Sequence, residues 1–237
     1  MTILRLDAPR CARSQCSYRF SSMTDSDKIV RALLRKHGRT FSEELGIRLR
    51  SSTPSALFRW LCAALLFSAR INNKIAMEAA RALTKHGWTS AKKMQAATWK
   101  QRAVALNRAG YARYDEKTSR MLADTSKLLL DHYKGDLRKL REAAKRDPRR
   151  ERELLMECKG IGDVGADIFF REVQVVWPEY APFADNVALK SARKLGLPAK
   201  ADGLAKLVSK EDFPRLLAAL VRCALAKDYA AIKKSAP

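Results

Sequence analysis

Apolar residues recur along most of the chain at the spacing of α-helices. Between Asn73 and His86 they fall at Ile75, Ala79 and Leu83. Steps of three and four residues bring side chains to one face of a helix, where they can pack against a core. The stretch that follows Pro54, ALFRWLCAALLFSAR, is instead apolar all round. It is predicted to be a helix at the centre of the protein.

Glycine and proline divide the chain into helices of ordinary length. Gly110 ends one predicted helix, Pro148 restarts the chain, and a helix from Asn186 to Leu195 is closed by Gly196 and Pro198. Alternating β-branched residues, which are typical of strands, are nearly absent. The pattern predicts an all-α protein, and 237 residues are enough to bury a full core.

One helical stretch, LLMECKGIGDVGADIFF (residues 154–170), is broken by two glycines and resumes at once. A glycine costs roughly 1 kcal/mol relative to alanine inside a helix, so Lys159 to Gly162 is predicted to be a tight turn. Glycine permits a positive φ and carries no side chain, so the amides of Gly160 and Gly162 can point outward at the next helix N-terminus. Such donors bind phosphate. A simple turn between packed helices produces the same pattern without a ligand.

The charge of the chain points to a polyanionic partner. The formal net charge is +22 at pH 7, and the basic residues are spread over the whole sequence. A single basic amphipathic helix would favour an anionic membrane surface, whereas this distribution favours nucleic acid. No apolar run reaches the ~18 to 20 residues that a membrane span needs, so no membrane partner is expected.

The cysteines do not indicate a structural framework. Their number is odd, their spacing is wide, and no CxxC pair occurs among Cys11, Cys16, Cys62, Cys158 and Cys223. Neither a set of disulfides nor a zinc site is therefore predicted. A reducing, cytoplasmic location fits this usage best.

Residues 1–22 differ from the remainder in composition. They contain four arginines, several serines and one acid, as organellar targeting peptides do. A disordered extension, or a true start at Met23, explains the same composition, and we favour this interpretation. The expected location is then the cytoplasm, in association with the nucleoid.

Asp185 stands immediately before the predicted helix 186–195, in the segment APFADNVALKSARKLGLP. An aspartate in this position ordinarily caps the helix. The helix dipole also keeps such a carboxylate ionised, which suits a catalytic anion. The position alone leaves both interpretations open.

Together these segments resemble a known family. LLMECKGIGDVGADIFF followed by PFADNVALKSARKLGL is similar to the helix–hairpin–helix and aspartate signature of the endonuclease III superfamily of DNA glycosylases. PSALFRWLCAALLFSARINNKIAMEAARAL and ALNRAGYARYDEKTSRMLADTSKLLLDHYKGDLRKL resemble the family's helices upstream of the hairpin, so the similarity spans about residues 52–197. It implies two helical lobes with a cleft between them. The expected barrel lobe is 74–184, and the second lobe combines 23–73 with 185–237.

The resemblance implies an enzyme of base excision repair that acts, as a monomer, on double-stranded DNA with a damaged or mismatched base. Asp185 matches the catalytic aspartate, which stabilises the oxocarbenium-like sugar and aligns or deprotonates water. The residues expected to contact DNA are Lys159, Gly160, Ile161, Gly162 and Gly165. Those at the expected base pocket are Arg70, Asn72 and Asn73. The family also implies a monovalent cation held by the backbone carbonyls of Met156, Cys158 and Ile161.

Two departures from the family narrow the expected chemistry. Bifunctional members carry a Schiff-base lysine where this chain has Val164, so hydrolysis without strand cleavage is expected. Many relatives hold an iron–sulfur cluster with four cysteines after the catalytic helix, where this sequence has Cys223 alone, so no cluster is expected. The alternative is an inactive DNA-binding member of the family. Asp163 favours it, because an acid beside the hairpin weakens contact with phosphate.

Overall fold

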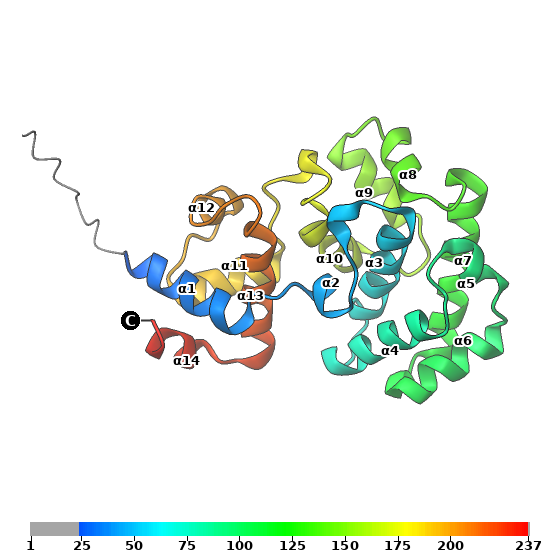
Figure 1. Cartoon of the computed structure of the whole chain (residues 1–237), viewed down its shortest axis with the longest axis horizontal. Helices are drawn as coiled ribbons and strands as arrows, with labels where there is room; N and C mark the ends of the chain where they lie inside the picture. Colours follow the sequence, from blue (N-terminus) through cyan, green and yellow to red (C-terminus); the bar gives the residue numbers. More distant parts are fainter. Residues whose placement is uncertain (1–23, 237) are drawn as a thin grey trace, which may run out of the picture.

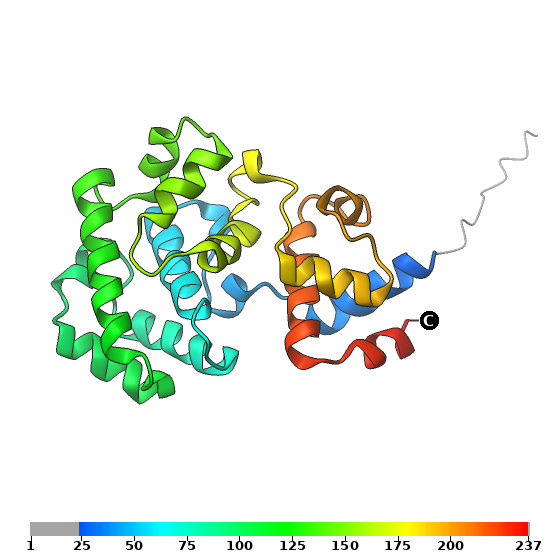
Figure 2. The ribbon, with the colours of Figure 1, turned by 180° about the vertical axis from the view of Figure 1, so that it is seen from behind.

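The computed structural model describes residues 24–236 and confirms the all-α prediction for them, since every regular element in that range is helical. The helices form two lobes, which Figures 1 and 2 show from opposite sides. The smaller lobe combines the two ends of the described chain. Its helices are α1 (Asp25–His37), α11 (Asn186–Leu195), α12 (Ala201–Ala205), α13 (Phe213–Ala226) and α14 (Tyr229–Lys234).

The larger lobe is formed by the middle of the chain. Its elements are α2 (Phe41–Glu44), η1 (Leu49–Ser51), α3 (Pro54–Phe67), α4 (Asn73–Lys85), α5 (Ala91–Ala96), α6 (Trp99–Leu106), the π-helical turn η2 (Asn107–Tyr111), α7 (Asp115–Tyr133), α8 (Leu137–Ala143), α9 (Pro148–Met156), α10 (Asp163–Val173) and η3 (Pro178–Tyr180). None of the described helices has both the length and the apolar character of a membrane span.

Helix α3 lies at the centre of the larger lobe, as its sequence predicts. It packs against α4, α8 and α10. The indole nitrogen of Trp60, which is fully buried, donates a hydrogen bond of 3.0 Å to the Phe169 carbonyl of α10. The observed lobe boundary differs from the expected one, which places residues 23–73 in the lobe of the chain ends. A helix that is apolar on every side needs neighbours all round, and α3 finds them in the middle of the chain.

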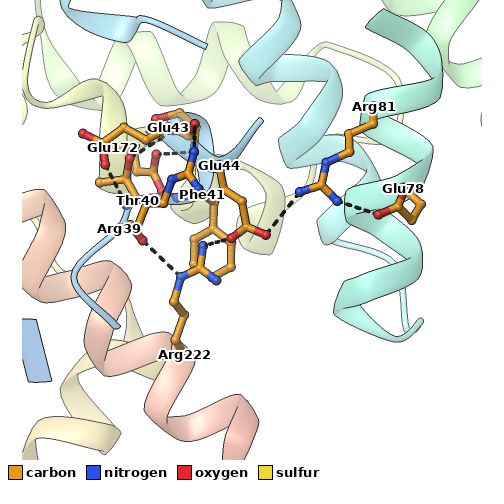
Figure 3. Close-up of polar contacts among 10 residues, drawn as sticks. Arg39, Thr40, Phe41, Glu43, Glu44, Glu78, Arg81, Glu172 and Arg222 are labelled. Atoms are coloured by element: carbon orange, nitrogen blue, oxygen red, sulfur yellow. Dashed lines mark hydrogen bonds and ion pairs between the residues drawn. The ribbon is translucent and has the colours of Figure 1, made fainter. Parts of the chain in front are cut away.

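The chain crosses between the lobes twice, after α1 and after η3 (Figure 1). At the first crossing, Arg222 of α13 donates to Glu44 of α2 at 2.6 Å and to the Arg39 carbonyl at 3.1 Å. The other Glu44 oxygen accepts from Arg81 of α4 at 3.2 Å, so one carboxylate joins helices of both lobes (Figure 3). Buried Glu172 of α10 fixes the same segment, because its oxygens accept from the backbone amides of residues 41 and 42 at 2.9 and 3.0 Å.

Candidate functional site

A pocket of about 270 Å³ lies where the two lobes meet. One wall comes from α10, a second from the start of α11, and a third from α13. Side chains on α2, α3 and α4 complete it. Its lining residues are Phe41, Phe67, Asn73, Val164, Asp167, Ile168, Arg171, Asp185, Asn186, Val187, Val221 and Leu225. A larger hollow of about 570 Å³ also lies beside the lobe junction, but it contains none of the predicted site residues.

Asp185 reaches this pocket from the N-terminus of α11. Its Oδ1 atom accepts hydrogen bonds from the amides of Val187 and Ala188 at 2.8 and 2.9 Å, so it caps the helix. Its Oδ2 atom accepts from Nη1 of Arg171 at 2.6 Å, and both side chains are almost completely buried. The two interpretations of Asp185 are therefore compatible, because one oxygen caps the helix and the residue also lines the pocket.

Arg171 is a site residue that sequence reasoning missed. Its guanidinium carbon lies 5.4 Å from the centre of the Phe41 ring, and its Nε atom has no hydrogen-bond partner among the described residues. An arginine in the apolar stretch IFFREV was the available signal, because a charged side chain among buried residues is normally paired with an opposite charge. Its partner Asp185 lies 14 residues further along the chain, in front of another helix, so helical periodicity does not predict the pair and only the fold shows it.

The turn between α9 and α10 follows the prediction for the hairpin. Gly160 has φ +89°, which an L-residue rarely adopts. A Cβ atom added there would lie 2.8 Å from Sδ of Met121, so this glycine faces the protein interior. The Thr125 hydroxyl donates to the Lys159 carbonyl at 2.9 Å, while the Lys159 side chain points into solvent at an exposed position.

Gly162 differs from the expectation of a positive φ. Its φ is −104°, and a Cβ atom added there would have nothing within 4 Å. The residue is exposed and precedes α10 directly. Its backbone conformation therefore does not require glycine. If the glycine has a role, the role is to leave room for something outside the chain.

Two of the residues expected to contact DNA are buried instead. Ile161 is 3% exposed and belongs to the hydrophobic core. Gly165 is buried in the first turn of α10, where an added Cβ atom would lie 3.3 Å from Ile161 and 3.7 Å from Ser68. Both residues therefore pack inside the protein, where they hold the turn beside the end of α3. Each was assigned from its place in a motif, which cannot distinguish an exposed backbone from a packed side chain.

The three predicted base-pocket residues are separated by the structure. Asn73 lines the pocket. Asn72 is exposed and caps α4, where its Oδ1 atom accepts from the Lys74 amide at 2.8 Å. Arg70 is exposed and is not among the pocket residues. Only the last residue of the SARINN segment therefore reaches the cleft in the described part of the chain.

Val164 occupies the mouth of the pocket and is 60% exposed. The position that the sequence resemblance aligns with the lysine of bifunctional members thus lies at the pocket, and an apolar side chain fills it here. Val187 and Leu225, which are 46% and 54% exposed, lie on the same rim. The entrance to the pocket is consequently apolar, and none of these three side chains supplies an amine.

Asp167 is a second carboxylate in the pocket that the sequence analysis did not identify. Nη1 of Arg152, on α9, lies 2.8 Å from its Oδ1 atom, and Nη2 of the same arginine lies 3.0 Å from Oδ1 of Asp163. Burial raises the pKa of Asp167, the ion pair with Arg152 opposes this, and the nearby charges of Asp185 and Asp163 add to the rise.

The carbonyls proposed to hold a monovalent cation lie in the hairpin turn. The Cys158 carbonyl accepts a hydrogen bond from the Ile161 amide at 2.9 Å. The carbonyls of Met156 and Ile161 accept none from residues 24–236. Oxygen atoms without donors are the ligands that hard cations require. These two carbonyl oxygens are therefore available as ligands for such an ion.

Comparison with known proteins adds structural matches only. No family model matches the chain, and no curated protein matches it significantly. A non-covalent complex of endonuclease III with DNA has a similar structure, with 17% identity and a TM-score of 0.53 over 85% of this chain and 86% of that one. A trapped covalent intermediate of endonuclease III with DNA, in an estranged-adenine complex, gives 17% identity and a TM-score of 0.45 over 69% and 71%. Together with the two lobes, the hairpin and the cleft, the first of these matches shows that the chain has the endonuclease III fold.

Proposed function

We propose that this protein is a monofunctional DNA glycosylase that hydrolyses the N-glycosidic bond of a damaged or mismatched base. The observation that carries the proposal is the position of Asp185 in a pocket between the lobes of an endonuclease III fold. A pocket in a cleft suits a base that has been turned out of the duplex, because its reacting atoms are not accessible within the base stack.

Asp185 supplies the anion in this reaction. Bond cleavage places positive charge on the sugar, and a buried carboxylate interacts with it more strongly than one in water does. The amides of Val187 and Ala188 hold the carboxylate in one orientation before the substrate binds. Because Val164 replaces the amine needed for a Schiff base, water is the nucleophile and the product is an intact abasic strand.

The partner in this proposal is double-stranded DNA bound by a monomer. The matching structure is a complex of endonuclease III with DNA, and the net charge of +22 favours the same class of ligand. The Lys159 side chain and the Gly162 backbone are the parts of the hairpin that are exposed to a phosphate. A monovalent cation at the Met156 and Ile161 carbonyls would add positive charge at the same turn.

A panel of duplexes tests the proposal. Each carries one altered base, such as uracil, thymine opposite guanine, an oxidised pyrimidine or an alkylated purine. The purified protein should excise at least one of them, and Asp185→Asn should lower that rate by at least about 10²-fold, as the loss of preorganised electrostatic stabilisation does. If no base in the panel is excised, or if the variant keeps the wild-type rate, the proposal is wrong.

The control is a second aspartate that caps a helix. Asp147 caps α9 through its Oδ1 atom, which accepts from the Arg149 amide at 2.9 Å, and it does not line the pocket. Asp147→Asn should keep the excision rate. Asp185→Asn leaves the buried Arg171 without its anion, which costs about 3–5 kcal/mol in comparable pairs. The folded fraction of each variant is therefore measured by circular dichroism at the assay temperature.

One observation favours the second candidate, a protein that binds DNA without excision. The Oδ2 atom of Asp185 already pairs with Arg171 at 2.6 Å, so a guanidinium offsets the charge that the reaction needs. In that case lesion-bearing duplexes are bound and recovered intact by wild type and Asp185→Asn alike. Asp163 disfavours contact with phosphate less than its charge alone suggests, because Arg152 pairs with it at 3.0 Å.

A further inference from the structure

One side of α10 carries a row of residues into the pocket. Asp167 and Ile168 come three and four residues after Val164, and Arg171 comes three residues after Ile168, so the four share a helical face, and all of them line the pocket. Asp167 lies between the open mouth at Val164 and the buried pair at Arg171. Its side chain is 25% exposed, so it is accessible to a ligand and largely shielded from water.

The charges around Asp167 are not balanced. Arg152 is shared, since it contacts Asp167 at 2.8 Å and Asp163 at 3.0 Å. Arg171 is already paired with Asp185. Three carboxylates thus face two guanidiniums beside a pocket with mostly apolar walls. Close carboxylates in such surroundings do not all ionise readily, and the one with the weakest compensation keeps its proton most easily.

Asp167 is the carboxyl that fits this description. Burial raises its pKa, the shared Arg152 lowers it, and the charges of Asp185 and Asp163 raise it again, with a net rise. Its Oδ1 atom contacts Arg152, whereas its Oδ2 atom makes no hydrogen bond with residues 24–236. One oxygen is therefore held in place and the other can carry a proton.

Hydrolysis of an N-glycosidic bond has a use for such a proton. The bonding electrons leave with the base, and a neutral base departs as an anion unless it gains a proton in the transition state. A base that alkylation has made cationic departs as a neutral molecule and needs no acid. An acid near the departing base therefore matters only for substrates of the first kind.

We propose that Asp167 is the general acid of the reaction and that the substrate is a neutral base, an inference that rests on the proposed glycosylase function. As the bond between C1′ and the base nitrogen breaks, its electron pair stays with the base. The proton of the Asp167 carboxyl passes to an acceptor atom of the base. Water adds to C1′ and releases one proton to solvent, from which Asp167 is protonated again. The net reaction consumes one water molecule.

The closing experiment compares neutral and cationic bases under single-turnover conditions. Duplexes carry either a neutral base from the panel or N7-methylguanine as the cationic base. Asp167→Asn should slow excision of the neutral base by about 10²- to 10⁴-fold, the usual contribution of a general acid. Any excision of N7-methylguanine should change by less than about threefold, since that base departs without help from an acid.

The pH profile provides a second measurement with a matched control. Excision of a neutral base by wild type should fall on the alkaline side, as Asp167 loses its proton. Asp163 shares Arg152 but does not line the pocket. Asp163→Asn removes a negative neighbour and leaves Arg152 to Asp167 alone, so it should lower the pKa of Asp167 and move the alkaline fall to lower pH. The shift of the alkaline fall in Asp163→Asn tests the role of Asp167 even if Asp167→Asn does not fold.

The outcomes separate this proposal from the proposed function. If wild type excises nothing, both are wrong. If it excises a neutral base and Asp167→Asn does so at the wild-type rate, the general acid alone is refuted. If only the cationic base is excised, or if Asp163→Asn leaves the alkaline fall where it was, the assignment of Asp167 is refuted while the glycosylase stands.

Discussion

The two hairpin glycines should respond in opposite ways to alanine. Gly160 has φ +89°, and an added Cβ atom would lie 2.8 Å from the Met121 sulfur and 3.3 Å from Leu65. Left-handed backbone costs roughly 1–2 kcal/mol, and displacing packed side chains adds about 1 kcal/mol. The smaller unfolded-state entropy of alanine returns about 0.4–1 kcal/mol. Gly160→Ala should therefore destabilise the protein by about 1–2.6 kcal/mol, which lowers Tm by about 2–10 °C at this size.

Gly162→Ala has neither cost. Its φ is −104°, and nothing lies within 4 Å of the added atom. Its stability should stay within about 1 kcal/mol of wild type. The order should be reversed for DNA affinity, which Gly162→Ala should lower and Gly160→Ala should leave unchanged. A Cβ atom at 162 projects from the exposed turn into the space of an approaching phosphate, whereas one at 160 projects toward the protein interior.

Thermal unfolding followed by circular dichroism, and fluorescence anisotropy with a labelled duplex, measure both properties on the same samples. We expect Gly160→Ala to melt early and to bind DNA normally below its transition. We expect Gly162→Ala to melt normally and to bind weakly. Equal melting losses would contradict the backbone geometry described for the turn. Normal DNA binding by Gly162→Ala would show that the hairpin does not approach phosphate through this residue.

Four further predictions follow from the charges and cysteines of the chain. DNA affinity should fall steeply with salt, and Lys159→Ala should reduce the slope of log K against log[salt] by about one, as loss of one phosphate contact does; an unchanged slope would exclude that contact. Borohydride should trap no covalent adduct with DNA, because Val164 has no amine, and a trapped adduct would show that another lysine acts. Purified protein should contain no stoichiometric iron by metal analysis, because Cys223 is the single cysteine after α11 and a cluster needs four such ligands; iron bound at four per chain would refute this. Burial and the adjacent Glu179 raise the pKa of fully buried Glu151 from 4.5 to about 8. The folded state holds the Glu151 proton more tightly than the unfolded state does, so the free energy of unfolding of the protein should decrease as pH rises from about 4.5 to about 8. In urea titrations Glu151→Gln should remove that decrease. If the variant keeps the pH dependence of wild type, groups other than Glu151 cause the decrease.

The helices and the hairpin were predictable because their signals are local. The all-apolar stretch after Pro54 and the glycine pair at residues 160 and 162 each determine structure within a few residues. The boundary between the lobes was not predictable in the same way. The lobe to which α3 belongs depends on whether it packs against α10 or against α13. Both helices have an apolar face, so the sequence pattern alone does not distinguish the two partners.

The site was predictable only in part for a related reason. Asp185 has a position in the sequence, before a helix, that identifies it as a cap and as a candidate anion. Arg171 and Asp167 lie inside α10, where isolated charges usually mark the solvated face of a helix. They become site residues because α11 begins beside that face, which is a consequence of the fold and not of the segment. Asn73 lines the pocket and Arg70 does not, because the pocket's other walls come from α10, α11 and α13, whose positions the SARINN segment does not determine.

The smaller lobe has a consequence for how the protein is made on the ribosome. Helix α1 packs against α13 and α14, and the Arg35 side chain donates to the Ser235 carbonyl at 3.3 Å. Helix α1 therefore reaches its native contacts only after α13 and α14 have been synthesised. The larger lobe is continuous in sequence and can assemble while synthesis proceeds, with domains generally folding as units during translation. A nascent chain that stops before α13 would therefore display the hairpin without a closed pocket. Completion of the C-terminal helices is the step that joins the two halves of the candidate site.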